Sequence, residues 1–354
     1  MRTKFLVWGV LVVVLILRFA STRVNFVNGQ LLKISGVVYS EPTTSYGKVS
    51  MNLSGIRVEI KTEEEVHYGD YLTVVGRYEK GKVVGDLIEI KRSTGVFEWI
   101  RNRLVLFYKS SLAEPHSSLV AGITIGAKSN LSRNLIDRLR KTGTSHIVVA
   151  SGTNVTLFGG FALSALVNIL SRRKAVILTI ISIWFYTFIA GLEAPIVRAA
   201  MMASIAFVGQ EFGRVINTAR ITLFTGYIMI FFVPSWLIDV GFLLSFATTI
   251  SLILLVPVFN KIVKFGPALL REDFITSLAA FIGSSPIILY FFGNFNILSP
   301  LFNMMVLWTV VPIMFIGGVG AVISFVFPTL GRLVVQAVMP LTSWFITIIN
   351  LQLL

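Results

Sequence analysis

The feature that most constrains this chain is the near-continuous apolar sequence that runs from residue 145 to residue 354. Apolar segments about 20 residues long recur there, separated by short loops that hold most of the charges, which is typical of helices that cross a lipid bilayer. Charged residues make up only 14% of the whole sequence, whereas soluble domains hold roughly 25%. The chain is therefore predicted to be a polytopic α-helical membrane protein.

Eight membrane-spanning helices are predicted in this region. They lie near residues 145–170, 175–191, 196–210, 220–236, 239–259, 274–293, 299–326 and 333–353. Another apolar run covers residues 5–17, and Arg18 and Arg23 follow it where a signal-peptide cleavage site should be small and neutral. Residues 1–27 are accordingly interpreted as a retained membrane anchor.

The basic residues of the loops predict an orientation, because lysine and arginine are enriched on the cytoplasmic side of membrane proteins. With the N-terminus inside and nine crossings, nine basic residues after residue 170 fall in cytoplasmic loops, and Arg198 alone falls in an external one. We therefore expect a multi-pass protein of the cytoplasmic membrane whose N-terminal domain and C-terminus lie on the external side.

Residues 28–93 differ in character from the rest of the chain. Five short runs rich in β-branched and aromatic residues alternate there with turn signals such as Gly55 and Gly81. Five strands at this spacing predict a small external β-barrel, and the OB-fold is the five-stranded candidate. OB barrels often bind single strands, but this region holds as many acids as bases. A structural role and weak nucleic-acid binding therefore both stay open.

Residues 94–144 carry a net charge of +5 and connect the two regions. Apolar positions at helical spacing over residues 96–112 predict an amphipathic helix in the membrane interface. Residues 119–127 are apolar but too short to span, so we expect them to be interfacial, re-entrant or packed in the bundle. The basic stretch that follows comprises Lys128, Arg133, Arg138, Arg140 and Lys141.

The densest polar set within the apolar region is TGTSHIVVASGTNVTLFGG, residues 142–160. Its glycines would weaken a continuous helix, and Thr153 or Asn154 could cap a helix that starts near Val155. A broken helix with its positive end at membrane depth suits an anionic substrate. The alternative is a helix rich in glycine and serine that packs closely on its neighbours. The candidate residues are His146, Ser151, Gly152 and Asn154.

Three further polar residues lie in or beside the predicted spans, where polar groups are costly to bury. Arg198 could face a water-filled path, could pair with Glu193 or Asp239, or could be a plain interfacial arginine. Asp239 could equally be present because an acid at a helix N-terminus is favourable. Asn303 is the last polar group deep in a predicted span.

Signatures of enzymes and metal sites are absent from the sequence. Without cysteine, disulfides, thiol catalysis and iron–sulfur clusters are excluded, and the three histidines lack metal-ligand spacing. The motifs G-x-S-x-G, H-E-x-x-H and GK[ST] are also missing. We therefore expect no catalytic residues, no metal and no cofactor.

The ordered motifs resemble those of the ComEC family of competence proteins, the inner-membrane channels for DNA uptake. The likeness covers about residues 118–326 and rests on AGITIGAKSNLSRNLIDRLRKTGTSHIVVASGTNVTLFGG, APIVRAAMMA, PSWLIDVGFLLSF and SPLFNMMVLWTVVP. The anchor and the small barrel also match the family's layout, in which an OB-like domain lies outside the membrane. HIVVASGTNV stands in place of the family motif H-L-x-A-I-S-G-L-H-V, so Asn154 replaces a histidine, and Leu243 replaces the usual glutamine.

The resemblance implies a channel that imports single-stranded DNA across the cytoplasmic membrane. The basic stretch would gather the strand by neutralising phosphates, and the candidate polar residues would line or support its path. A cytoplasmic helicase-type motor would supply the energy, and separate nuclease and DNA-receptor proteins would be further partners.

Many members of the family continue into a metallo-β-lactamase-like domain, whereas this sequence ends at Leu354. We therefore expect either a short family form or a nuclease on a separate polypeptide. Two other functions stay open from the residues alone. One is transport of a smaller anionic solute, with the β-domain as a docking module, and the other is a membrane assembly scaffold.

Overall fold

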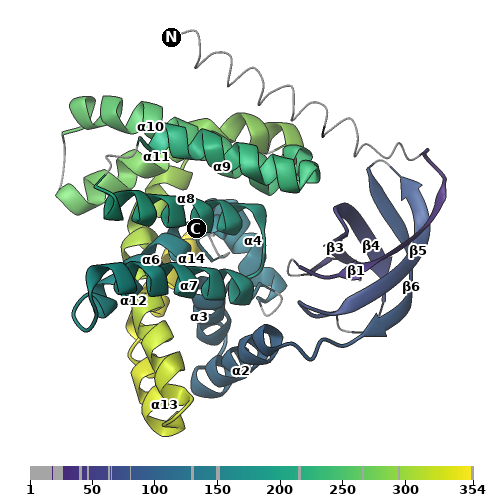
Figure 1. The fold of residues 1–354 in the computed structure, drawn as a ribbon, viewed down its shortest axis with the longest axis horizontal. Helices are drawn as coiled ribbons and strands as arrows, with labels where there is room; N and C mark the ends of the chain where they lie inside the picture. Colours follow the sequence, from purple (N-terminus) through teal and green to yellow (C-terminus); the bar gives the residue numbers. More distant parts are fainter. Residues whose placement is uncertain are drawn as a thin grey trace.

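A six-stranded sheet and a bundle of helices make up this protein, which was analysed as a computed structural model (Figure 1). The structure describes residue 18 and residues 27–351, with gaps at 40–41, 46–47, 63, 65, 80, 129–130, 149–151, 214–216, 265–266 and 294–295. Most of the predicted anchor, residues 1–27, and the candidate Ser151 therefore lie outside the described residues.

The sheet follows the order β1-β5-β6-β4-β3-β2. β4 and β6 are parallel, and the other neighbours are antiparallel. All five predicted runs form strands, and β2 is an additional short one. β1 and β2 stand at the two ends of this order and do not pair with each other in the part of the chain that the structure describes, so the ladder is open and the predicted closed barrel is not confirmed. The strands are β1 Leu31–Val37, β2 Thr43–Ser45, β3 Lys48–Leu53, β4 Ile56–Lys61, β5 Tyr71–Glu79 and β6 Lys82–Lys91.

The sheet encloses its own hydrophobic core, separate from the core of the helices. Alternate side chains point inward, as the period of two along a strand requires; in β3 these are Val49, Met51 and Leu53. Gly76 of β5 and Gly85 of β6 face each other, and a Cβ on either would lie 2.5 Å or less from the opposite backbone. The two glycines therefore allow a close approach that curves the sheet.

The helices follow the sheet along the chain. They are α2 Val96–Ser111, α3 His116–Ile125, α4 Arg133–Thr142, α5 Ser145–Val148, α6 Gly152–Leu166, α7 Arg172–Ala190, α8 Ala194–Glu211, α9 Thr218–Phe232, the 3-10 helix η1 Pro234–Ile238, α10 Val240–Ile262, α11 Ala268–Phe292, α12 Ser299–Ser324, α13 Pro328–Gln336 and α14 Met339–Asn350. In Figure 1, α12 runs across the direction of α7.

Four helices among the described residues are long and apolar enough to cross a membrane: α7, α10, α11 (from Leu270 to Phe291) and α12. The bent pair α13 and α14 would make a fifth span, which corresponds to the prediction for residues 333–353. This supports a multi-pass membrane protein with fewer spans than the eight predicted.

Three predicted spans do not meet that test. The one near residues 145–170 corresponds to α5 and α6, whose described residues lie on either side of the gap at 149–151, and the one near 220–236 corresponds to α9. α6 and α9 have 15 residues each, about 22 Å at 1.5 Å per residue, which is less than the roughly 30 Å of a hydrocarbon core. α8 reaches 18 residues but includes Arg198 and Glu211.

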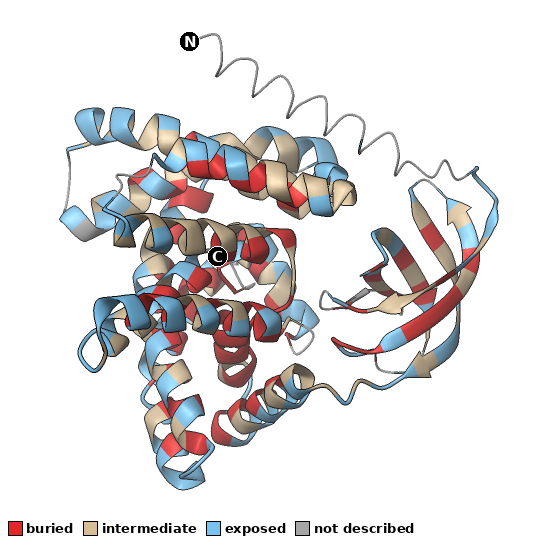
Figure 2. Ribbon diagram, in the orientation of Figure 1, coloured by how far each residue is buried: buried red, intermediate tan, exposed pale blue. Residues whose placement is uncertain are grey.

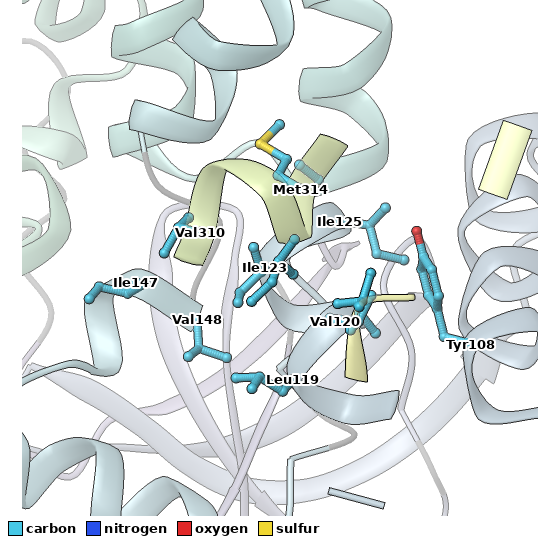
Figure 3. Close-up of a cluster of buried hydrophobic side chains, with 14 of the residues drawn as sticks. Tyr108, Leu119, Val120, Ile123, Ile125, Ile147, Val148, Val310 and Met314 are labelled. Carbon is cyan, nitrogen blue, oxygen red and sulfur yellow. The ribbon is translucent and has the colours of Figure 1, made fainter. Parts of the chain in front are cut away.

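Helix α3 lies at the centre of the bundle. Every residue from Ser117 to Ile125 is buried, and Figure 2 shows the helix in red. Its apolar side chains pack on Tyr108, Val148 and Val310 of neighbouring helices (Figure 3). Of the three placements expected for residues 119–127, packing in the bundle is therefore the one observed.

Candidate functional site at the C-terminal end of α3

The C-terminal end of α3 is buried, although the last carbonyl groups of a helix lack intrahelical partners. Two of them bond to side chains from other helices. Asn154 Nδ2 of α6 donates to the Ile123 carbonyl at 2.7 Å, and the Tyr186 hydroxyl of α7 donates to the Thr124 carbonyl at 2.9 Å. Each bond prevents a penalty of about 1–3 kcal/mol for an unpaired buried group.

Arg101 of α2 satisfies the next two carbonyls of the same helix end. Its guanidinium donates to the Ile125 carbonyl at 2.7 Å and to the Gly126 carbonyl at 3.1 Å, and it also bonds to the Ile189 carbonyl of α7. Arg101 is only 4% exposed. One cation therefore neutralises the negative ends of two helices.

The position of Arg101 corrects part of the interfacial prediction for residues 96–112. That segment is helical, but Arg101 faces the bundle instead of the membrane surface. Arg101 shares one face of α2 with Leu104, Tyr108 and Ser111, which are all buried. The spacing of 3, 4 and 3 residues is visible in the sequence and could have placed Arg101 inside.

Tyr68 of the β-domain reaches the same place. Its hydroxyl donates to the Phe188 carbonyl of α7 at 2.9 Å, and the Arg101 guanidinium lies 5.4 Å from the centre of its ring. Burial raises the pKa of Tyr68 to about 12, against a lowering effect of Arg101, so the hydroxyl stays a hydrogen-bond donor at neutral pH. Tyr39 adds a backbone contact, in which its carbonyl accepts from the Leu192 amide at 3.1 Å. The β-domain thus docks on the C-terminal end of α7.

Asn154 does not cap α6, as one sequence hypothesis held. α6 begins at Gly152 instead of near Val155, and Asn154 is 1% exposed with its amide turned to α3. Its neutral amide supplies the one donor that the Ile123 carbonyl needs. The reason is tertiary, because no local pattern reveals a carbonyl that belongs to another helix.

Arg198 lies against the first turn of α6. A Cβ on Gly152 would be 3.1 Å from Arg198 Nη2. The guanidinium therefore fits beside position 152 because glycine has no side chain. The guanidinium carbon lies 5.8 Å from the ring centre of Phe246, and the buried Nε has no hydrogen-bond partner among the described residues. The Arg198 guanidinium therefore lies beside the first described turn of α6.

Glu193 and Asp239 do not form the ion pairs considered for Arg198. Lys128 Nζ lies 2.6 and 2.8 Å from the two carboxylate oxygens of Glu193. Asp239 caps α10, since its Oδ1 accepts from the Phe242 amide at 2.8 Å. Burial raises the pKa of Asp239, and the nearby Glu193 adds to that rise while Lys128 opposes it. The acids therefore belong to Lys128 and to a helix cap.

The basic stretch is only partly available to a ligand. Lys128 is paired with Glu193, and Arg138 bonds to the side chains of Asn134 and Asn350. The exposed cations of α4 are Arg133, Arg140 and Lys141, which project from the face opposite its buried Leu135 and Leu139. Arg140 contacts Asp137 at 4.0 Å, but both are well exposed, so the pair is weak.

His146 and Asn303 are linked through the Gly143 carbonyl and the Ser299 hydroxyl where α12 begins. His146 Nδ1 donates to the Gly143 carbonyl at 3.0 Å, and the Ser299 hydroxyl reaches it at 3.4 Å. Asn303 Nδ2 is 3.5 Å from the Ser299 hydroxyl, while its buried Oδ1 has no partner among the described residues. Gly152 and Arg198 thus lie together, His146 and Asn303 are linked here, Asn154 lies at the end of α3, and Asp239 caps α10.

A polar pocket of about 240 Å³ lies where the β-domain joins α2. Asp70, at its base, accepts from the Arg92 guanidinium at 2.9 Å and from the Ser93 amide at 3.1 Å. The remaining lining residues are His67, Tyr68, Glu98 and Asn102. Asp70 and Arg92 thus pair with each other where the β-domain joins α2.

Comparisons with known proteins agree with the motifs. A family model described as "Competence protein" matches residues 123–353. The chain is 28% identical over 207 residues to ComE operon protein 3 of Bacillus subtilis (strain 168), which is 58% of this chain and 26% of that protein. It is 25% identical over 205 residues to an uncharacterized protein of Aquifex aeolicus (strain VF5), which is 57% of this chain and 46% of the other.

The chain thus spans about a quarter of the first relative and less than half of the second. No solved structure matches. The family match begins at Ile123, in the last turn of α3, and includes Asn154, Arg198, Asp239 and Asn303.

Proposed function

The chain belongs to the competence protein family, and from this premise we propose that it conducts single-stranded DNA inward across the cytoplasmic membrane. A family role in competence and several helices apolar enough to cross a membrane support this function. Partners follow from the same proposal: a cytoplasmic helicase-type motor to pull the strand, and separate nuclease and DNA-receptor proteins.

The observation that carries the proposal is the position of Arg198 against the first turn of α6. The first amide groups of a helix lack intrahelical partners and attract anions. A guanidinium beside them adds charge and a geometry that matches phosphate oxygens. Because the buried Nε of Arg198 has no partner among the described residues, a passing phosphodiester group would supply one.

The exposed cations of α4 supply a second element of the proposed path. Arg133, Arg140 and Lys141 would neutralise phosphates before the strand enters the bundle. Each such contact releases counterions, so the logarithm of the affinity should fall with the logarithm of salt by roughly 0.7 per contact on a single strand.

We also propose an OB-like barrel for residues 28–93. If β1 and β2 are the two halves of one bent strand, each of five strands pairs with the next around a ring. The Ser54 hydroxyl donates to the Ser35 carbonyl at 3.0 Å, which brings the end of β3 to β1. The parallel pair β4 and β6 completes the circuit.

The orientation of the domains is part of the proposal. Tyr68 and Tyr39 contact the C-terminal end of α7, whereas Arg172 and Arg173 at its start lie 3.5 and 3.4 Å from Glu211 at the end of α8. The β-domain and these basic residues are therefore at opposite ends of α7. Since basic loops favour the cytoplasm, this supports an external β-domain, joined through the basic segment 94–144 to a membrane region at 145–354.

The test is uptake of labelled oligonucleotides into liposomes that contain the purified protein and an internal DNA trap. Single strands of increasing length should enter, and a duplex should not. Arg198→Ala should slow entry about tenfold, which corresponds to about 1.4 kcal/mol on the barrier. The matched control Arg172→Ala, at the other end of the bundle, should keep the original rate.

Entry of only the shortest oligonucleotides would contradict a polymer channel and favour a solute carrier. Equal loss of folded protein in Arg198→Ala would assign that residue a structural role. Absence of entry, even with a helicase-type motor added, would overturn the proposed function.

A further inference from the structure

Helix α3 fills the space through which a path across the centre of the bundle would run. Its ten residues span about 15 Å, too short to cross a bilayer. It is surrounded by α2, α5, α7, α12 and α14. A Cβ on Gly317 of α12 would be 2.9 Å from Thr124 Cγ2, and a Cβ on Gly122 would be 2.7 Å from Val148 Cγ1. The contact surfaces are therefore tight (Figure 3).

Hydrogen bonds from side chains of other helices hold the two ends of α3. At the start, His116 Nδ1 lies 2.7 Å from the Thr342 hydroxyl of α14. At the C-terminal end, four successive carbonyls bond to Arg101, Asn154 and Tyr186, as described above. When water enters, these carbonyls can accept hydrogen bonds from water in place of the side-chain donors. Helix α3 can therefore move out of the bundle without leaving its backbone carbonyls unpaired.

Arg101 is the contact that the β-domain can influence. It bonds to α3 and α7 and lies over the Tyr68 ring, and Tyr68 itself bonds to Phe188 beside the Ile189 carbonyl. Any displacement of the β-domain therefore pulls on the group that holds the end of α3. The other two donors, Asn154 and Tyr186, belong to α6 and α7 of the bundle.

We propose that α3 is a displaceable plug, that Arg101 is the positioning residue that latches its C-terminal end, and that Tyr68 connects this latch to the β-domain. The latch is a property of the fold, and only the identity of what passes the opened plug rests on the proposed function. The ligand that would move the β-domain is the strand itself, an extended polyanion.

The latch can be tested without transport, because the sequence has no cysteine. Thr124→Cys places a single thiol at a position that is 4% exposed, and a membrane-impermeant maleimide should label it slowly in proteoliposomes. Adding Arg101→Gln should raise the labelling rate about tenfold, because labelling follows the population of the open form. Tyr68→Phe should raise it less, since the ring remains over Arg101.

The matched control is Arg103→Gln. Arg103 lies on the same helix, but its guanidinium stacks over Trp99 and Phe325 instead of reaching α3. It should leave the labelling of Thr124→Cys unchanged. A second control thiol, Ala279→Cys in α11, is fully buried in the parent and should stay unlabelled when Arg101→Gln is added. An unchanged rate at position 124, or equal labelling at position 279, would overturn the latch.

The plug is tested by a disulfide. A Cβ at Gly317 would lie 2.9 Å from Thr124 Cγ2, so the pair Thr124→Cys with Gly317→Cys is close enough to bridge and would tie α3 to α12. Oxidation should abolish uptake of single strands, and a reductant should restore it. The control pair Gly320→Cys with Val335→Cys ties α12 to α13 and leaves α3 free, so oxidation should not change its uptake.

The outcomes separate the two proposals. If the Thr124→Cys and Gly317→Cys protein takes up single strands equally fast in its oxidised and in its reduced form, the plug is overturned. The proposed channel function would not be affected by that result. Absence of uptake in both redox states would count against the proposed function, and the maleimide result alone would then decide for or against the latch.

Discussion

Helices α3 and α10 show opposite relations between sequence and burial. α10 has a mean hydropathy of 2.3, the highest of the four candidate spans, yet only 17% of its apolar stretch is buried. α3 has serines and a threonine among its ten residues, yet all of Ser117–Ile125 is buried. Figure 2 shows the contrast, with α3 in red and α10 mostly in tan and pale blue.

The difference follows from the surroundings. Lipid tails are as apolar as leucine, so no hydrophobic force drives an apolar helix to the centre of a membrane protein. The exposed residues Ile250, Leu254, Val258 and Ile262 recur every four positions along α10, which forms a stripe suited to lipid. α3 uses small residues and polar bonds instead, such as the bond from the Thr124 hydroxyl to the Val120 carbonyl at 2.6 Å. In this protein, high hydropathy thus indicates a helix that faces lipid, as in α10. Small and polar residues indicate a helix that packs against other helices, as in α3.

The largest effect should come from Arg101→Leu. This change removes the donor from three buried carbonyls, at Ile125, Gly126 and Ile189. Since each unpaired group costs about 1–3 kcal/mol, the free energy of unfolding should fall by at least about 3 kcal/mol. Denaturant unfolding in detergent would measure it. A loss no larger than that of Arg103→Leu would show that the end of α3 does not depend on this residue.

Two adjacent glycines of α12 test how tightly α3 is packed. A Cβ at Gly317 would press on Thr124 and Val120, whereas a Cβ at Gly318 would meet nothing within 4 Å. Gly317→Ala should destabilise by about 1–3 kcal/mol through overpacking. Gly318→Ala should stabilise by up to about 1 kcal/mol through helix propensity. Equal effects in thermal unfolding would contradict the close contact between α3 and α12.

A smaller loss is expected for Tyr186→Phe, which removes only the hydroxyl that bonds to the Thr124 carbonyl. The free energy of unfolding should fall by about 1–2 kcal/mol, because one buried carbonyl loses its partner while the ring packing stays. Tyr290→Phe is the control, since Tyr290 is 83% exposed. If the two variants unfold at the same denaturant concentration, water or a neighbouring donor replaces the hydroxyl.

The smallest effect is predicted on α10. Leu254 is 63% exposed, so Leu254→Ala should change the free energy of unfolding by no more than about 0.5 kcal/mol. Unfolding in detergent and in lipid nanodiscs would both measure it. A loss above about 2 kcal/mol would mean that this face of α10 is covered by protein and would remove the contrast with α3.

Local patterns allowed much of the fold to be predicted. The five β runs are strands because alternation with a period of two is a local property, as in Val49, Met51 and Leu53. α10, α11 and α12 match predicted spans because length and hydropathy are also local. Among the described residues, the predicted spans near 145–170 and 220–236 are not matched by a helix long enough to cross, since α6 and α9 are too short.

The candidate site was predicted less well, because its residues act through partners that are distant in the sequence. Gly152 and Arg198 were singled out, and the structure brings them together. One hypothesis made Thr153 or Asn154 the cap of its own helix, but Asn154 bonds to the Ile123 carbonyl, 31 positions away. Lys128 was grouped with DNA-gathering cations, but it pairs with Glu193.

The sequence by itself determined that this is a membrane protein with a β-domain, which family it resembles, and which few polar residues deserve an explanation. Those properties depend on composition, periodicity and ordered motifs. Only the tertiary structure decided which polar group satisfies which, such as Arg101 at the ends of α3 and α7. The physical reason is that a buried carbonyl must find a donor wherever the packed helices bring one, and sequence distance does not limit that choice.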